Sequence, residues 1–223
     1  MRMDFIKRLF NSISELFFPP RCPYCRKVMK NDSYACEDCK KRFPEESYKR
    51  YAIGGYLCSA PFLYKDIFKD GILRLKYGKN KSYAKPLSFM LVQGILEIHH
   101  ENLSEFDLVT CVPMHKDSYK NRDYNQAELL ARECAEIMEL PYADTLIKFK
   151  VTQPQHCIKA NRRAKNVKGV YRIIDKDLIK DKNILIIDDI ITTGHTLGEC
   201  ARILTKGGCK SVNCAVVCST IAH

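Results

Sequence analysis

Residues 184–197, ILIIDDIITTGHTL, join an apolar run, two acids and a hydroxyl-rich turn in one short segment. The four apolar residues 184–187 follow a charged run and predict a strand buried on both faces of a parallel sheet. Ligands bind at the carboxyl ends of such strands, and Asp188 and Asp189 follow there. A helix over about 195–206 would add its positive end at the same place. The segment therefore predicts an α/β fold with an anion-binding strand, turn and helix.

The turn after the acids has the composition of a phosphate-binding loop. Successive backbone N–H groups can curl around a phosphate, hydroxyls add donors, and glycine permits a positive φ or a close approach. The expected phosphate-binding residues are Thr192, Thr193, Gly194, His195 and Thr196.

The acid pair narrows the expected ligand. Two carboxylates repel bare phosphate, but they accept hydrogen bonds from vicinal ribose hydroxyls and ligate hydrated Mg²⁺. The segment resembles the phosphoribosyl pyrophosphate (PRPP) motif of type I phosphoribosyltransferases. The resemblance implies that Asp188 and Asp189 are catalytic residues that hold the ribose and the Mg²⁺ shell. The alternative is an ordinary strand, turn and helix in which Asp189 or Thr192 caps the helix.

Two CxxC pairs near the start, CPYC and CEDC, have the spacing of zinc ligands, namely Cys22, Cys25, Cys36 and Cys39. Residues 20–42 carry few large apolar side chains, so we expect a zinc ion to replace a core, with roughly 10–16 kcal/mol of apparent binding energy. Disulfides are the alternative. The first 20 residues do not resemble a secretory signal and no long apolar stretch exists, so we expect a reduced, cytoplasmic protein without a membrane span.

The other cysteines lack CxxC spacing and are expected to be small core residues: Cys58, Cys111, Cys134, Cys157, Cys200, Cys209, Cys214 and Cys218. His99 and His100 are expected to be surface residues at a helix end. Apolar residues between Phe5 and Phe17 recur at helical spacing and predict an amphipathic helix over 1–18, which Pro19 and Pro20 end. This helix would pack on its own domain, or else on a partner or a membrane surface.

Strands and helices alternate along the rest of the chain. We predict strands over 56–64, 106–112, 144–149, 169–174 and 211–218, and helices over 65–77, 83–99 and 125–138. This order predicts an α/β parallel sheet flanked by helices, as in type I phosphoribosyltransferases. The expected domains are the helix 1–18, a zinc ribbon over 19–48 and a phosphoribosyltransferase-like domain over 49–223.

A second loop is expected at the same edge of the sheet. Met114, His115 and Lys116 directly follow the strand that ends at 112, so they should emerge beside the two acids. Phosphoribosyltransferases place a pyrophosphate-gripping loop at this position, which needs positive charge. The alternative is a surface loop whose lysine is merely solvated.

Basic charge is concentrated in two parts of the chain. Residues 1–90 hold 19 Lys and Arg against 9 Asp and Glu, and residues 148–172 hold eight basic residues and no acidic ones. Both favour a polyanionic partner, of which single-stranded DNA is a natural candidate. Tyr171 is available for stacking on bases, and the candidate contacts are Arg122, Gln155, Arg162, Arg163 and Lys165. The alternative for the second stretch is a solvated loop that closes over PRPP.

Taken together, the zinc ribbon, the RDYNQ sequence at 122–126, the basic stretch 155–169 and the PRPP-type segment resemble the ComF family of competence-associated proteins. Asp123 stands where that family usually has glycine. The resemblance implies PRPP binding with Mg²⁺ and handling of single-stranded DNA in natural transformation, beside a DNA-translocating helicase.

Two other functions stay open at this point, a nucleotide-salvage phosphoribosyltransferase and a non-catalytic zinc-ribbon adaptor that senses PRPP. Purine-salvage enzymes that resemble hypoxanthine-guanine phosphoribosyltransferase carry an aspartate where this chain has Thr192, and a threonine cannot assist proton transfer at neutral pH. Thr192 therefore argues against that substrate class, and the acceptor is not identified.

Overall fold

The computed structural model describes residues 19–30, 33–44, 49–100, 102–120, 123–150 and 168–220. The predicted helix over 1–18 lies outside these ranges, as does Cys157. The five nucleic-acid candidates also lie outside the described residues: Arg122, Gln155, Arg162, Arg163 and Lys165.

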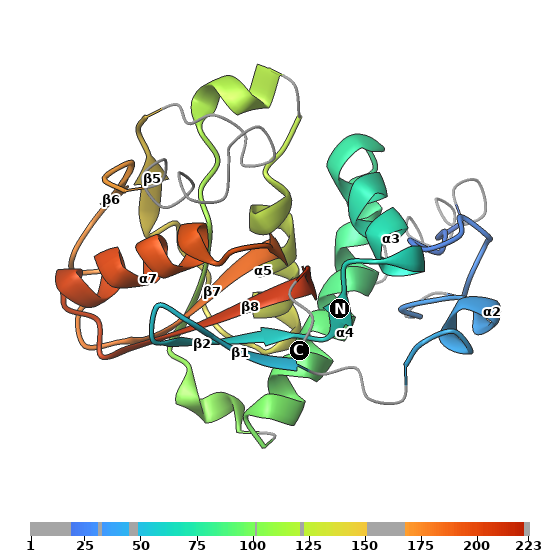
Figure 1. Cartoon of the computed structure of the whole chain (residues 1–223), viewed down its shortest axis with the longest axis horizontal. Helices are drawn as coiled ribbons and strands as arrows, with labels where there is room; N and C mark the ends of the chain where they lie inside the picture. Colours follow the sequence, from blue (N-terminus) through green and yellow to red (C-terminus); the bar gives the residue numbers. More distant parts are fainter. Residues whose placement is uncertain are drawn as a thin grey trace, which may run out of the picture.

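A largely parallel sheet forms the centre of the molecule (Figure 1). Its strands are β1 (Lys49–Ile53), β2 (Tyr56–Ala60), β8 (Ser211–Ser219), β7 (Asn183–Ile191) and β4 (Leu108–Cys111), in that spatial order, and β3 (Phe62–Leu63) also pairs with β8. Every pair in this sheet is parallel except β1 with β2. An antiparallel edge strand on a parallel sheet is common. The predicted α/β class is confirmed, although β1 was not predicted.

Helices cover both faces of the sheet (Figure 1). The helices α3 (Asp66–Tyr77), α4 (Ala84–Ile98) and α5 (Gln126–Ile137) share one core, and α7 (His195–Gly207) lies on the opposite face. Short 3₁₀ helices are η1 (Lys81–Tyr83), η2 (Leu103–Glu105) and η3 (Lys116–Lys120).

The chain leaves the neighbouring strands β4 and β7 toward opposite faces, because α5 follows β4 and α7 follows β7. The sheet therefore has a topological switch point between these two strands, and in open α/β sheets ligands bind at such a point.

The strand β7 is buried at its centre, with Ile184, Leu185, Ile186 and Ile187 fully buried, as predicted. The strand is longer than predicted, because it does not end at the two acids but continues to Ile191 and pairs there with β8. On the other side of β7, strand β4 ends at Cys111, which pairs with Ile187. The acid-bearing part of β7 therefore extends beyond β4 at the carboxyl edge of the sheet.

Two predicted strands do not join the main sheet. β5 (Leu146–Lys148) and β6 (Tyr171–Ile173) pair antiparallel with each other as a separate two-stranded ribbon.

The predicted strand 56–64 is divided into two strands of the main sheet, because Pro61 separates β2 from β3 and lacks the N–H that a continuous ladder needs. The other predicted elements are found with boundaries shifted by at most two residues.

The four-cysteine segment packs tightly on the main domain, and its short helix α2 is Glu37–Lys40 (Figure 1). Tyr24 is 2% exposed and meets Phe43 and Phe68 edge-on, at centroid distances of 5.3 and 5.6 Å. Tyr34 stacks on Phe89 of α4 at 5.3 Å. The expectation that metal replaces a core is therefore incomplete, because this segment shares an aromatic core with α3 and α4.

The buried cysteines agree with their expected role. Seven of the eight cysteines outside the CxxC pairs are described, and all seven are buried. His100 is exposed, but His99 is buried, and its Nδ1 lies 2.8 Å from Glu105 Oε2. The prediction of a surface residue is wrong for His99, because a partner from η2 allows the imidazole to be buried.

Candidate functional site

Two lysines act on the two acids of β7. Successive side chains of a strand point to opposite faces. Asp189 is 8% exposed, and its Oδ2 lies 2.9 Å from the Nζ of Lys76 in α3. Asp188 is partly buried and interacts electrostatically with Lys148 at the end of β5. The acid pair is thus bracketed by two cations from distant parts of the sequence.

Burial, and after it the negative charge of the neighbouring Asp189, raises the pKa of Asp188 to about 7. The positive charges of Lys76 and Lys148 oppose this rise. Burial also lowers the pKa of Lys148. A bound cation or a hydrogen-bond donor on Asp188 would favour its ionised form, so this carboxyl suits a Mg²⁺ shell or a ribose diol.

The turn after β7 requires its glycine. Gly194 has φ +72°, and a Cβ at this position would lie 2.4 Å from Cγ2 of Ile53 in β1. The sequence predicted either a positive φ or a close approach at Gly194. Both occur, and the group that approaches Gly194 closely is the side chain of Ile53. The turn can therefore hold its shape only with glycine.

The first turn of α7 is open to an anion. Gly194 is the N-cap, so neither Asp189 nor Thr192 occupies the N-cap position that the alternative gave them. The first turn carries no acidic residue. His195 Nδ1 lies 2.7 Å from Thr193 Oγ1, so these two side chains support each other within the turn. Such an arrangement suits a phosphate group.

The β5–β6 ribbon flanks the turn. Tyr171 of β6 forms a side-chain hydrogen bond with Thr196, and Lys148 of β5 lies 5.8 Å from the centroid of its ring. Tyr171 is 5% exposed and burial raises its pKa. The prediction that Tyr171 is available to stack on bases is wrong, because its ring packs in the core beside α7.

The predicted pyrophosphate loop emerges at the expected edge. Cys111, the last residue of β4, pairs with Ile187, so the loop lies next to the acid-bearing part of β7. Met114 and His115 are partly buried, while Lys116 is exposed. The Nδ1 of His115 accepts a hydrogen bond of 3.1 Å from the backbone N–H of Asp117. The pyrophosphate-binding role of this loop stays a prediction.

The RDYNQ element supports the loop and α3. Asn125 caps α5 through the N–H of Ala127 and donates to the carbonyl of Val112 at 3.0 Å. Tyr124 donates to the carbonyl of Leu75 at 2.6 Å. Asp123 Oδ2 lies 3.7 Å from Lys79 Nζ, in an exposed pair. This element therefore ties the loop after β4 to the end of α3.

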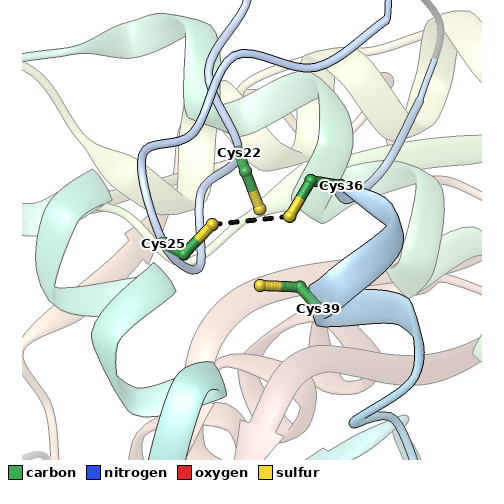
Figure 2. A group of neighbouring side chains, drawn as sticks. All are labelled: Cys22, Cys25, Cys36 and Cys39. Atoms are coloured by element: carbon green, nitrogen blue, oxygen red, sulfur yellow. Dashed lines mark hydrogen bonds between the residues drawn. The ribbon is translucent and has the colours of Figure 1, made fainter.

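The four CxxC cysteines converge, and Figure 2 shows their sulfurs directed toward one point. All four Sγ atoms lie within 4.8 Å of one another, and those of Cys25 and Cys36 are 3.4 Å apart. A tetrahedral zinc site with Zn–S bonds of about 2.3 Å needs separations of about 3.8 Å. Burial and the neighbouring thiols raise the pKa of Cys39, so a metal ion is needed to hold it as thiolate. The residues fit structural zinc.

The helix α3 connects this metal centre to the acid pair. Arg74 Nη1 donates to the carbonyl of Pro23 at 2.7 Å and to that of Tyr24, the two residues between the cysteines of the first CxxC pair. Lys76 lies two residues further along the same helix. Neither Lys76 nor Lys148 was predicted as a site residue, since no local pattern distinguishes them from other lysines; only the tertiary fold brings them to the acids.

Two family models match the chain. A phosphoribosyl transferase domain matches residues 125–223, and a double zinc ribbon domain matches residues 13–50. These matches cover the β7–α7 segment and the cysteine cluster described above. Both matches agree with the resemblance to the ComF family.

Relatives over most of the length agree with this resemblance. Competence protein F of Haemophilus influenzae is 25% identical over 86% of this chain and 82% of its own length. Competence protein ComFC of Streptococcus pneumoniae is 28% identical over 86% of this chain and 77% of its own length. DNA utilization protein YhgH of Escherichia coli K12 is 24% identical over 90% of this chain and 84% of its own length. This chain thus resembles proteins named for competence and for DNA utilization.

Among solved structures, adenine phosphoribosyltransferase from Thermoanaerobacter pseudethanolicus is 14% identical, covers 81% of this chain and 99% of its own, and has a TM-score of 0.41. A likeness at this level carries no argument about function. In the described part of the chain, no helix combines the length and the apolar character that crossing a membrane would take.

Proposed function

We propose that this protein, which resembles the ComF family, binds PRPP with Mg²⁺ at the carboxyl edge of β7 and acts on single-stranded DNA during DNA uptake. Asp188 and Asp189 hold the ribose hydroxyls and the Mg²⁺ shell, and the turn from Thr192 to Thr196 holds the 5′-phosphate. The loop of Met114, His115 and Lys116 receives the diphosphate. One observation carries the proposal, namely that the acid pair and a helix N-terminus with glycine at its N-cap adjoin at the switch point of the sheet.

The chemistry open to such a site is displacement at the ribose anomeric carbon. The bond to the diphosphate oxygen breaks, and a bond to a nitrogen nucleophile forms. Mg²⁺ bound with PRPP supplies positive charge to the departing diphosphate. The protein contributes by positioning the sugar phosphate and by stabilising charge, because none of the site residues described above is placed as a general base.

The charge and aromatic content of one surface support the DNA part of the proposal. Lys79 and Lys81 are exposed between α3 and α4, and Lys85 continues this surface along α4. Phe89 lies one turn further, is 36% exposed and stacks on Tyr34 of the zinc ribbon. We call these five residues the basic face. Lysines for phosphates and aromatic rings for bases are what single strands need.

The names of the relatives, competence proteins and a DNA utilization protein, support a role in DNA uptake. We place this role in the cytoplasm, beside a DNA-translocating helicase. Thr192 favours an acceptor outside the class of 6-oxopurines, because its hydroxyl cannot assist proton transfer at the purine.

Binding and turnover are tested separately. Calorimetry with PRPP and Mg²⁺ should give saturable binding that is lost in Asp188→Asn plus Asp189→Asn, and binding that survives in this variant contradicts the proposed site. Release of pyrophosphate in the presence of candidate acceptors then distinguishes an enzyme from a PRPP-sensing adaptor. Absence of turnover with intact binding would favour the adaptor.

For DNA, labelled single strands are titrated at several salt concentrations against the wild type and Lys79→Ala plus Lys81→Ala. The logarithm of affinity should fall with the logarithm of salt, and the slope should decrease by about one to two in the variant. An unchanged slope in the variant would remove the basic face from the proposal. A flat salt response in the wild type would remove DNA altogether.

A further inference from the structure

Lys76 is held against the acid pair by a nearly buried contact. Its Nζ lies 2.9 Å from Asp189 Oδ2, and the two side chains keep 17% and 11% of their exposure. The phosphoribosyltransferase match begins at residue 125, so Lys76 lies outside the matched domain. No role at the site follows for Lys76 from the family model.

The backbone just before Lys76 is fixed on two sides. Leu75 accepts the hydrogen bond from the Tyr124 hydroxyl at 2.6 Å, and Arg74 is bonded to the carbonyls of Pro23 and Tyr24. An ordinary surface lysine would lose solvation by being drawn into this position. The ammonium group is therefore presented to the site by contacts from the zinc ribbon and from the RDYNQ element, which is the kind of support that a binding residue needs.

The charge of the expected ligand explains why a cation belongs here. The diphosphate of PRPP is a polyanion, and Asp188 and Asp189 would repel it where it joins the ribose. Lys116 is exposed on its loop, whereas Lys76 already contacts Asp189. An ammonium group has three donors and can hold a carboxylate and a phosphate oxygen together.

We propose that Lys76 is a diphosphate-binding residue of this site. In the ligand-free protein it holds Asp189, and with PRPP bound it also donates to the diphosphate, so the acids can face the ribose without repelling the leaving group. This inference rests on the proposed PRPP site.

The test compares two ligands that differ in the diphosphate. PRPP and ribose 5-phosphate, each with Mg²⁺, are titrated by calorimetry into the wild type, Lys76→Met and the control Lys69→Met. Lys69 is an exposed lysine on the same helix. Loss of a charge-assisted hydrogen bond should weaken PRPP binding by about tenfold or more in Lys76→Met. Ribose 5-phosphate should bind all three proteins alike.

Each other outcome has a distinct meaning. Equal weakening of both ligands would overturn the inference, since Lys76 would then act only by orienting Asp189. Unchanged binding of PRPP by Lys76→Met would also overturn the inference, since the contact between Lys76 and Asp189 would then be only a structural ion pair. If the wild type binds neither ligand, the proposed function itself fails. If Lys76→Met does not fold, Lys76→Arg replaces it. The proposal would be contradicted if this variant binds PRPP as tightly as the wild type does but binds ribose 5-phosphate with a different affinity.

Discussion

Tyr24 offers the sharpest test of how the zinc ribbon is held. The ring lies between Phe43 and Phe68, and its hydroxyl has no hydrogen-bond partner among the described residues. Truncation to alanine leaves a cavity next to Gly71, where an added Cβ would lie 3.2 Å from the ring. Large-to-small changes of a buried aromatic cost about 3–5 kcal/mol in the free energy of unfolding.

The Tyr24 hydroxyl, unlike the ring, should lower the free energy of unfolding. A buried polar group without a partner costs about 1–3 kcal/mol, so Tyr24→Phe should be neutral or stabilising by about 1 kcal/mol. For a chain of this size each 1 kcal/mol shifts Tm by about 2–4 °C. Tyr24→Ala should therefore lower Tm by roughly 6–20 °C, and Tyr24→Phe should leave it unchanged or raise it slightly.

Thermal and urea unfolding of the zinc-loaded protein can be followed by far-ultraviolet circular dichroism, since the chain contains no tryptophan. The control is Tyr77→Ala, because Tyr77 is 61% exposed and its loss should cost little. The shared aromatic core is disproved if Tyr24→Ala behaves like this control. It is also disproved if Tyr24→Phe is as destabilising as Tyr24→Ala.

Three further predictions concern the turn, the acid pair and the metal. Gly194→Ala should destabilise the protein by more than about 1–2 kcal/mol, because it adds left-handed strain to the clash with Ile53, and an unchanged urea midpoint would contradict this. Because the pKa of Asp188 is raised in the folded state, stability should decrease as pH rises from about 4 to about 7 and then level off. Asp188→Asn should remove up to about 1.4 kcal/mol per pH unit of this slope, and parallel stability curves for the two proteins would count against the raised pKa. Replacing Cys22 and Cys39 by serine should abolish binding of about one zinc ion per chain, measured by metal analysis, and should lower the Tm of the whole protein through the shared core; retained stoichiometric zinc would disprove the site.

The sequence predicted best the elements whose patterns are local. The buried residues of β7, the glycine in the turn before α7, the CxxC cluster and the helix boundaries follow from hydrophobic runs, glycine and cysteine spacing. The ends of β7 and the separation of β5 and β6 from the main sheet did not follow, because strand pairing depends on residues far apart in the chain.

The residues around the acids were the least accessible to sequence reasoning. Lys76 belongs to α3 and reaches Asp189 across more than one hundred residues of chain. Tyr171 was expected on the surface but is buried beside α7, and Tyr24 was not expected to join a core with α3. In each case the tertiary packing, not the local pattern, determines the environment of the side chain.

A crystal structure of the protein with PRPP and Mg²⁺ would decide whether the carboxyl edge of β7 is a PRPP site. We predict the 5′-phosphate within hydrogen-bond distance of the backbone N–H groups of the turn 192–196, and the ribose hydroxyls at Asp188 and Asp189. A ligand bound elsewhere, or a sugar phosphate that leaves both carboxylates without a ribose or metal contact, would show that the site is wrong.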